Sequence, residues 1–316
     1  MQTKKANWFM LLVTVLPFFY QLIFGMVPLE LPLWLRLMMG ELLILVSILI
    51  YCAMTRKESF WKRIPHEKLG IRVMLLIVLY TLLTSPLMAV CNLLSQFLVR
   101  NTAVQVMDVA GGLPFAVLFF AIAILPPIVE ELGFRGIMLQ NYRESGVWSG
   151  ILLSALLFGL MHMNLNQMLY AFVLGILMAL LVEATNSIFS SMLMHFLING
   201  SNVLMMYSSF QAAEGSTQEL YDASLAELGI SHEMLLVVAV LMFLIFAVAG
   251  IALAVPVYKK IASLSGREGY IRALFKGNVQ PSRKDRRMTI PLILAIVCSV
   301  AYIVFDTLVQ MGIIRL

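Results

Sequence analysis

Charged residues are scarce in this chain. Asp, Glu, Lys and Arg make up only 12% of its 316 residues, about half the share of an average soluble protein. Hydrophobic residues make up 61%, and the mean hydropathy is +0.93. A water-soluble globule of this length needs far more polar surface, so that class is excluded. The apolar runs are continuous, which also excludes a transmembrane β-barrel, whose strands alternate over ~10 residues.

Cysteine is rare too, and its three copies exclude a disulfide framework. Cys52, Cys91 and Cys298 are far apart, none belongs to a CxxC pair, and each lies in an apolar stretch. We expect three inert thiols buried in lipid.

Long apolar stretches, in contrast, fill the chain. A helix needs roughly 20 mostly apolar residues to cross ~30 Å of hydrocarbon. Stretches that qualify lie at about 8–28, 35–54, 72–98, 113–140, 148–165, 166–185, 187–207, 234–257 and 289–312. The sequence therefore predicts an all-α polytopic membrane protein with eight to nine transmembrane helices.

The loop charges predict the orientation of these helices. Six Lys or Arg lie in 55–72 and nine in 259–287, whereas 208–233 holds five acidic residues and no Lys or Arg. Because basic loops stay in the cytoplasm, we expect the acidic loop outside, the N-terminus cytoplasmic and the C-terminus external. The basic loops are interpreted as topology signals that touch anionic lipid headgroups.

Ionisable side chains inside spans are costly, so each is a candidate for function. Three groups stand out, and they are Glu130, Glu131 and Arg135 in the fourth span, Phe158 and His162 in the fifth, and His195 and Asn199 in the seventh. At 1.5 Å per residue from the cytoplasmic helix ends, the candidates lie about 12 to 21 Å deep. We therefore expect one site near the middle of the membrane.

This set of side chains suits the hydrolysis of a carbonyl compound. A buried carboxylate beside a neutral histidine can hold a water molecule and accept its proton. A second histidine and an amide can donate hydrogen bonds to the oxyanion that forms. Glu131 and Arg135, four residues apart, can form an ion pair that holds the helix face in place. Pro126 and Pro127 can kink the helix and free backbone groups toward a wet cavity.

Structural interpretations stay open for each residue taken alone. A single intramembrane histidine more often joins helices by hydrogen bonds, and a Glu–Arg pair can be a buried salt bridge or part of an ion path. The common depth of the three groups favours chemistry. Glu41 and Asp306 have no matching partners in the sequence and receive no role. Asn164 and Asn166 are interpreted as caps of a helix break.

Together the three groups resemble the motif series of one family. EELGFR (130–135), FGLMH (158–162) and HFLIN (195–199) are similar to the EExxxR, FxxxH and HxxxN/D motifs of the CPBP family. That family comprises CAAX prenyl endopeptidases, bacteriocin-processing proteins and abortive-infection membrane proteins. The resemblance implies that Glu130 activates water with His162 and that His195 and Asn199 stabilise the oxyanion. It also implies that Glu131 and Arg135 support the site.

On this resemblance the chain divides into three parts. Residues 1–112 hold the first three helices, and residues 113–207 form a CPBP-like catalytic core of helices four to seven. Residues 208–316 hold the acidic external loop, an eighth helix, the basic cytoplasmic loop and a ninth helix. The catalytic cavity is expected between the fourth, fifth and seventh helices, with its mouth facing the cytoplasm.

Other intramembrane proteases do not fit. The HExxH motif of zincins is absent, and so are the GxGD element of the aspartyl type and the GxSG serine of rhomboids. Two histidines and a glutamate could still ligate zinc, and Glu130, His162 and His195 would then be the ligands. We favour a metal-free glutamic mechanism without a cofactor and keep zinc as the alternative.

The resemblance implies an intramembrane endopeptidase that cleaves a membrane-associated protein or peptide, in the manner of CAAX processing. The expected partners are membrane lipids and a peptide or protein substrate, either lipidated or a bacteriocin-like precursor, and no nucleic acid. Short loops and the charge pattern suit a bacterial plasma membrane. The alternative is a non-proteolytic transporter, or an immunity or scaffold protein that retains the motifs.

Overall fold

The computed structural model describes residues 2–26, 31–55, 60–212, 227, 229, 231–282 and 287–315. Within these ranges the chain is helical and has no β-strand, only an isolated bridge between His66 and Ser187. The predicted all-α architecture is confirmed. Several of the predicted topology charges lie outside the described residues, namely Arg56, Lys57, Glu214, Glu219, Asp222, Arg283, Lys284 and Arg286.

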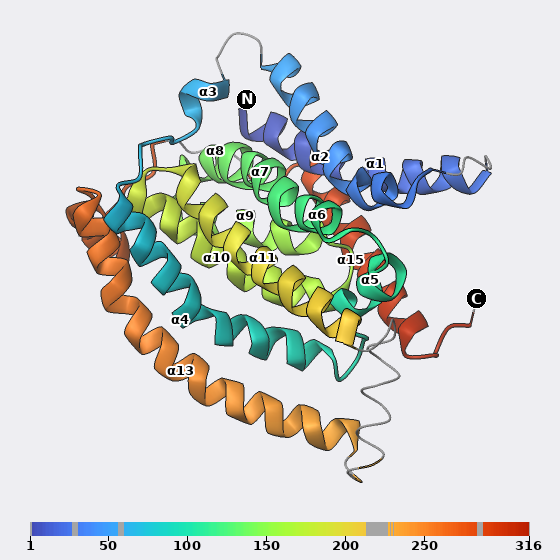
Figure 1. The fold of residues 1–316 in the computed structure, drawn as a ribbon. Coiled ribbons are helices and arrows are strands. Elements are labelled where there is room, and N and C mark those ends of the chain that lie inside the picture. Colours follow the sequence, from blue (N-terminus) through green and yellow to red (C-terminus); the bar gives the residue numbers. More distant parts are fainter. Residues whose placement is uncertain are drawn as a thin grey trace.

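Helices occupy every stretch where the apolar pattern predicts a span (Figure 1). They are α1 (Gln2–Met26), α2 (Leu33–Met54), α4 (Ile71–Ser95), a composite helix (Phe115–Arg143), α9 (Val147–Leu160), α10 (Leu165–Thr185), α11 (Ile188–Ala212), α13 (His232–Leu264) and α15 (Ile290–Gln310). Shorter helices are α3 (Phe60–Arg63), α5 (Thr102–Ala110) and α14 (Glu268–Phe275). Within the described ranges, 7 of the long helices are apolar enough to cross a membrane, namely all of the first set except α1 and the 14-residue α9.

The composite helix is continuous but not uniform. It runs through α6 (Phe115–Leu118), the π-helix η1 (Phe119–Ile124), α7 (Leu125–Glu131), the π-helix η2 (Leu132–Leu139) and α8 (Gln140–Arg143). A π segment accommodates an extra residue per turn and is common at functional sites. The two π segments flank α7, so they set the direction in which α7 presents its side chains.

The helices α9 and α10 form a tight antiparallel pair in the middle of the bundle (Figure 1). Gly159 permits the close approach, because a Cβ there would lie 2.8 Å from the carbonyl oxygen of Met168. The turn between the helices has Met163 at a φ of 56°. The Asn164 side chain caps α10 by accepting a hydrogen bond from the backbone N–H of Gln167 at 2.7 Å, so its expected capping role is confirmed.

Asn166 has another function than the expected cap. Its Oδ1 accepts from the backbone N–H of Thr102 at 3.0 Å, and its Nδ2 donates to Ser95 Oγ at 2.7 Å. The side chain is buried. It therefore joins the start of α10 to the end of α4 and the start of α5, instead of capping its own helix.

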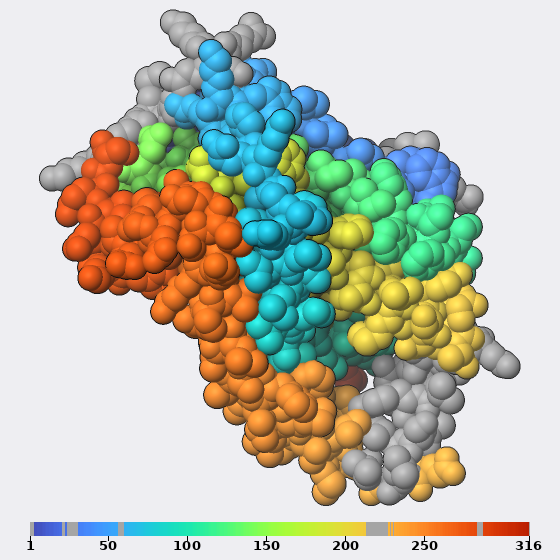
Figure 2. All heavy atoms as spheres, turned by 60° about the vertical axis from the view of Figure 1, so that its left-hand side comes forward, coloured from blue at the N-terminus to red at the C-terminus, as the bar shows by residue number. Residues whose placement is uncertain are grey.

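On the outside of the bundle, α13 lies along α4 over most of its length (Figure 2). Much of α13 is exposed and apolar, with Ile245 and Val248 more than 60% exposed. An apolar exposed face of this kind suits contact with lipid tails. The pair α4 and α13 thus forms one flank of an integral membrane protein.

At the end of the bundle that carries the basic stretches, buried Glu183 joins three helices. Its Oε2 lies 2.8 Å from Arg143 Nη2 and 3.8 Å from Arg267 Nη2, and it accepts from the Tyr270 hydroxyl at 2.7 Å. Burial, together with the Glu183 charge, raises the pKa of Tyr270 to about 12, which keeps its phenol protonated as a donor. We refer to this region as the basic end.

Candidate active site

The carboxylate pair of α7 is buried in the centre of the bundle. Glu130 is 5% exposed, and Glu131 and Arg135 are at most 1% exposed. The ion pair expected from the i, i+4 spacing is present, with Arg135 Nη1 2.8 Å from Glu131 Oε1. Arg135 Nη2 also donates to the carbonyl oxygen of Gly175 at 3.3 Å. The guanidinium therefore ties α7 and η2 to α10.

Phe158 lies between Arg135 and the two histidines. The Arg135 guanidinium carbon is 4.3 Å from the centroid of the ring, a cation–π contact. The same ring meets His162 at 5.2 Å and His195 at 5.8 Å, both close to perpendicular. Phe158 thus restricts the orientation of both imidazole rings. This contact explains why the FxxxH pattern has a phenylalanine at this position.

The ring of His162 is fixed by a backbone carbonyl. Its Nδ1 lies 2.9 Å from the carbonyl oxygen of Phe158. That carbonyl is free because α9 ends at Leu160 and the His162 N–H donates to Gly159 instead. A carbonyl oxygen can only accept, so Nδ1 carries the hydrogen and Nε2 of the neutral ring keeps its lone pair.

His195 lies between the two carboxylates of α7. Its Nδ1 donates to Glu131 Oε1 at 3.1 Å, and its Nε2 is 3.7 Å from Glu130 Oε2. A carboxylate that accepts from Nδ1 fixes the orientation of the ring. Glu131 therefore orients His195, whereas Glu130 faces the other ring nitrogen.

Asn199 is held by a carbonyl that the proline pair sets free. Its Nδ2 donates to the carbonyl oxygen of Ile122 at 2.9 Å. In an α-helix that oxygen would bind the N–H of residue 126, and in a π-helix that of residue 127. Both positions are proline, which has no N–H. The expectation that Pro126 and Pro127 free backbone groups is confirmed, and the second N–H of the Asn199 amide remains available.

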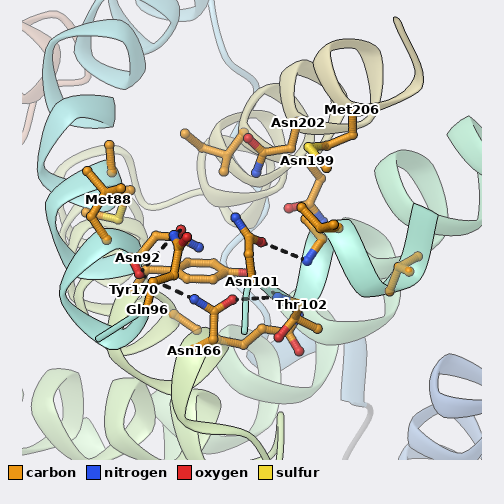
Figure 3. A pocket seen from close by; sticks show the side chains of 18 of the residues that line it. Met88, Asn92, Gln96, Asn101, Thr102, Asn166, Tyr170, Asn199, Asn202 and Met206 are labelled. Atoms are coloured by element: carbon orange, nitrogen blue, oxygen red, sulfur yellow. Dashed lines mark hydrogen bonds between the residues drawn. The ribbon is translucent and has the colours of Figure 1, made fainter. Parts of the chain in front are cut away.

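One cavity of about 1340 Å³ brings Glu130, His162, His195 and Asn199 together. Figure 3 shows its uncharged polar part, where side chains from α4, α10 and α11 face one another. The carboxamides among its lining residues are Asn92, Gln96, Asn101, Asn166, Gln167, Asn199, Asn202 and Gln310. The four candidate residues thus come from α7, from the turn after α9 and from α11, and they surround a common space.

The lining residues also show where this cavity extends. They include most residues of 85–107, several residues in the second half of α11 and in the first half of α13, and Gln310 near the end of α15. None belongs to the basic stretches 55–72 or 259–287. The backbone N–H of Arg100 donates to Gln310 Oε1 at 3.0 Å, which places these two segments together. The cavity therefore reaches the end of the bundle opposite the basic end.

That position conflicts with one sequence-based expectation. A mouth facing the cytoplasm and basic loops in the cytoplasm cannot both hold, because the two features lie at opposite ends of the bundle. The sequence showed the depth of the candidate residues but not which helix ends surround them. The charge pattern rests on 15 Lys and Arg residues in two stretches, and it favours a mouth on the non-cytoplasmic side.

Glu41 on α2 is a residue of this cavity that the sequence did not reveal. It lines the same space as Glu130, and the two carboxyl groups interact electrostatically. The Oε2 atom of each is buried without a hydrogen-bond partner among the described residues. A glutamate inside an apolar span was the available signal, but no motif on α2 indicates its partner.

The donor types at the site would suit zinc, but their arrangement does not. Both histidines use Nδ1 for a carbonyl or a carboxylate, which is common for metal-ligating histidines. Nevertheless, across the part of the chain that the structure describes, no three His, Cys, Asp or Glu side chains gather closely enough to hold a metal ion. Glu130, His162 and His195 do not form a zinc site as arranged here.

Residues 112–201 match a family model described as Rce1-like, type II CAAX prenyl endopeptidase Rce1-like. No curated protein and no solved structure matches the chain. The matched segment contains all three motifs and both π segments, and it leaves α1, α2, α4, α13 and α15 outside. The resemblance drawn from the motifs is confirmed for this segment: residues 112–201 of this integral membrane protein are similar to the Rce1-like, type II CAAX prenyl endopeptidase model of the CPBP family.

Proposed function

We propose that this protein is an intramembrane endopeptidase that hydrolyses a peptide bond of a membrane-associated protein or peptide. The observation that carries the proposal is the meeting of Glu130, His162, His195 and Asn199 at one buried cavity. Acyl transfer to water requires groups that accept hydrogen bonds from the water and groups that donate hydrogen bonds to the oxyanion, and this site supplies two of each. All four residues lie in the matched segment, residues 112–201.

In this mechanism, a water molecule binds between the Glu130 carboxylate and the Nε2 lone pair of His162. Glu130 takes the proton as the water oxygen adds to the carbonyl carbon of the scissile bond. The tetrahedral oxyanion accepts hydrogen bonds from His195 Nε2–H and from the second N–H of Asn199. Collapse breaks the C–N bond, and the proton on Glu130 passes to the leaving amine. The carboxylate is then restored.

The supporting residues give these groups their protonation states and positions. Glu131 accepts from His195 Nδ1 and fixes the ring, and in the proposed mechanism His195 acts as an imidazolium whose Nε2–H faces the oxyanion. Arg135 neutralises Glu131 and stacks on Phe158. The carbonyl of Phe158 fixes the tautomer of His162 that leaves Nε2 as an acceptor. This mechanism is metal-free, with zinc as the alternative.

The topology and the substrate follow from the loop charges and the family. In our proposal the N-terminus is cytoplasmic, the C-terminus is external, and the membrane is a bacterial plasma membrane. The substrate is a lipidated protein or a bacteriocin-like precursor, as the range of CPBP proteins implies. The non-proteolytic alternative, a transporter or an immunity or scaffold protein, would keep the buried ion pair for structure alone.

The test is a comparison of membrane peptides from cells that contain the wild type, Glu130→Gln or Glu268→Gln. Glu268 is an exposed residue of α14, so its variant is a matched change of charge away from the site. We expect new N-termini in the wild type and in Glu268→Gln that are missing in Glu130→Gln, at equal protein levels. Identical peptides in all three strains would favour the non-proteolytic alternative.

A further inference from the structure

We propose that the cavity takes an uncharged, extended peptide segment from the non-cytoplasmic side of the membrane. The inference rests on the proposed function and defines its substrate class. The cavity lining comes from the helix ends opposite the basic end, namely the ends of α4, α11 and α15 and the beginning of α13. Where basic loops lie in the cytoplasm, those helix ends lie on the other side.

The chemistry of the lining indicates which ligand fits there. Carboxamides predominate among the polar side chains between the mouth and Glu130, and each has both a donor and an acceptor. Several of these amides hold the walls together: Gln96 donates to Asn92 at 2.5 Å and Asn166 donates to Ser95 at 2.7 Å. Asn199 and Asn202 come from α11 on the facing wall (Figure 3). Groups that alternate donor and acceptor pair with the main chain of an extended peptide.

Charge is sparse along the same path. Among the described lining residues, Arg100 is the one Lys or Arg, and it lies at the mouth with an exposed side chain. Glu41 and Glu130 are the carboxyl groups. A strongly charged segment would lose its hydration in the cavity without gaining a partner. The favoured ligand is therefore a neutral stretch next to a membrane anchor, on the external face.

Cysteine labelling tests the side of entry without any need for catalysis. In a variant with Cys52, Cys91 and Cys298 replaced by alanine, single cysteines are placed at Asn202, at the mouth, and at Lys276, at the basic end. A membrane-impermeant maleimide is added to intact and to permeabilised cells. We expect Asn202→Cys to react in intact cells and Lys276→Cys only after permeabilisation. The reverse pattern would overturn the inference.

The positions of cleavage supply the second arm. New N-termini that depend on Glu130 should fall in external segments close to a transmembrane helix, and they should lack Lys, Arg, Asp and Glu around the cut. Cuts in cytoplasmic segments would contradict external entry while leaving the protease activity intact. If no N-terminus depends on Glu130, the proposed function fails, and the substrate class fails with it, whereas the labelling still reports where the cavity opens.

Discussion

The side-chain amide of Asn199 takes the place of a backbone N–H, because it donates to the Ile122 carbonyl that no residue of its own helix can reach. The cause lies in Pro126 and Pro127, which remove both possible backbone donors. The proline pair and Asn199 are far apart in sequence, but the carbonyl that the prolines leave unpaired is the acceptor that holds the Asn199 amide. The oxyanion donor that we propose is thus positioned by a defect in the helix that carries the water-activating carboxylate.

Replacing Pro126 by alanine would return one N–H to the helix. The new donor would compete with Asn199 for the Ile122 carbonyl and release the amide from its position. We expect kcat to fall while the thermal stability stays the same or rises, since an interior proline is replaced by a good helix former. Pro256→Ala, in the lipid-facing part of α13, is the control and should leave kcat unchanged. Full activity in Pro126→Ala would show that the bond to Ile122 does not position Asn199.

Arg135→Ala should destabilise the protein by about 3–5 kcal/mol, because it leaves Glu131 buried without its partner. Arg135→Lys should recover only part of this, since a lysine lacks the planar fork and stacks poorly on Phe158. The control is Arg272→Ala, which removes an exposed pair with the same spacing and the same 2.8 Å distance. That loss should stay below about 1 kcal/mol. Thermal unfolding in detergent measures all three.

Glu130 and His162 should behave as one unit in a double-mutant cycle. Glu130→Gln and His162→Ala should each abolish turnover, and the double variant should be barely worse than either single one, because residues that act together are non-additive. Asn199→Ala should instead cost about 10²–10³ in rate, as expected for one oxyanion donor, with KM nearly unchanged. Additive losses for Glu130 and His162 would mean that they act in separate steps.

Treatment with a chelator distinguishes the metal-free glutamic mechanism from the zinc alternative. Water held by a carboxylate and an imidazole should remain reactive after exhaustive treatment with a chelator, whereas a zinc-bound hydroxide would be lost with its metal. The assay is cleavage by purified protein in detergent, with the metal content measured in parallel. Stoichiometric zinc, together with activity that zinc alone restores, would make Glu130, His162 and His195 ligands and reject the glutamic mechanism.

Much of the fold could be predicted from the sequence, because the lipid bilayer requires each membrane-spanning segment to be long and apolar. A span must be apolar for about 20 residues, so α2, α10 and α15 begin and end within two residues of the predicted stretches. The pairing of Glu131 with Arg135 followed from helical spacing in the same way. Both predictions depend on residues close together along the chain.

The missing part of the site depends on packing between distant helices. Glu41 and Glu130 are separated by 89 positions, and nothing on α2 reports which neighbour its carboxyl meets. The expected cytoplasmic mouth disagrees with the loop charges for a related reason. The depth of a residue can be read from its own helix, but the side on which a cavity opens is set by the helix ends that converge there, such as Arg100 and Gln310.

Because π segments lie on both sides of α7, the number of residues in the composite helix determines the direction in which the carboxylate pair of α7 points. Each holds a residue that an α-helix of equal rise would omit, and one residue corresponds to about 100° of rotation. Deleting a single residue from 132–139 would therefore restore regular helix geometry and at the same time turn the carboxylate pair relative to Tyr142, whose hydroxyl is anchored on Asn7. Such a shortened helix would gain regular hydrogen bonds and lose the site. In this span, insertions and deletions are thus more damaging than most exchanges of one side chain for another.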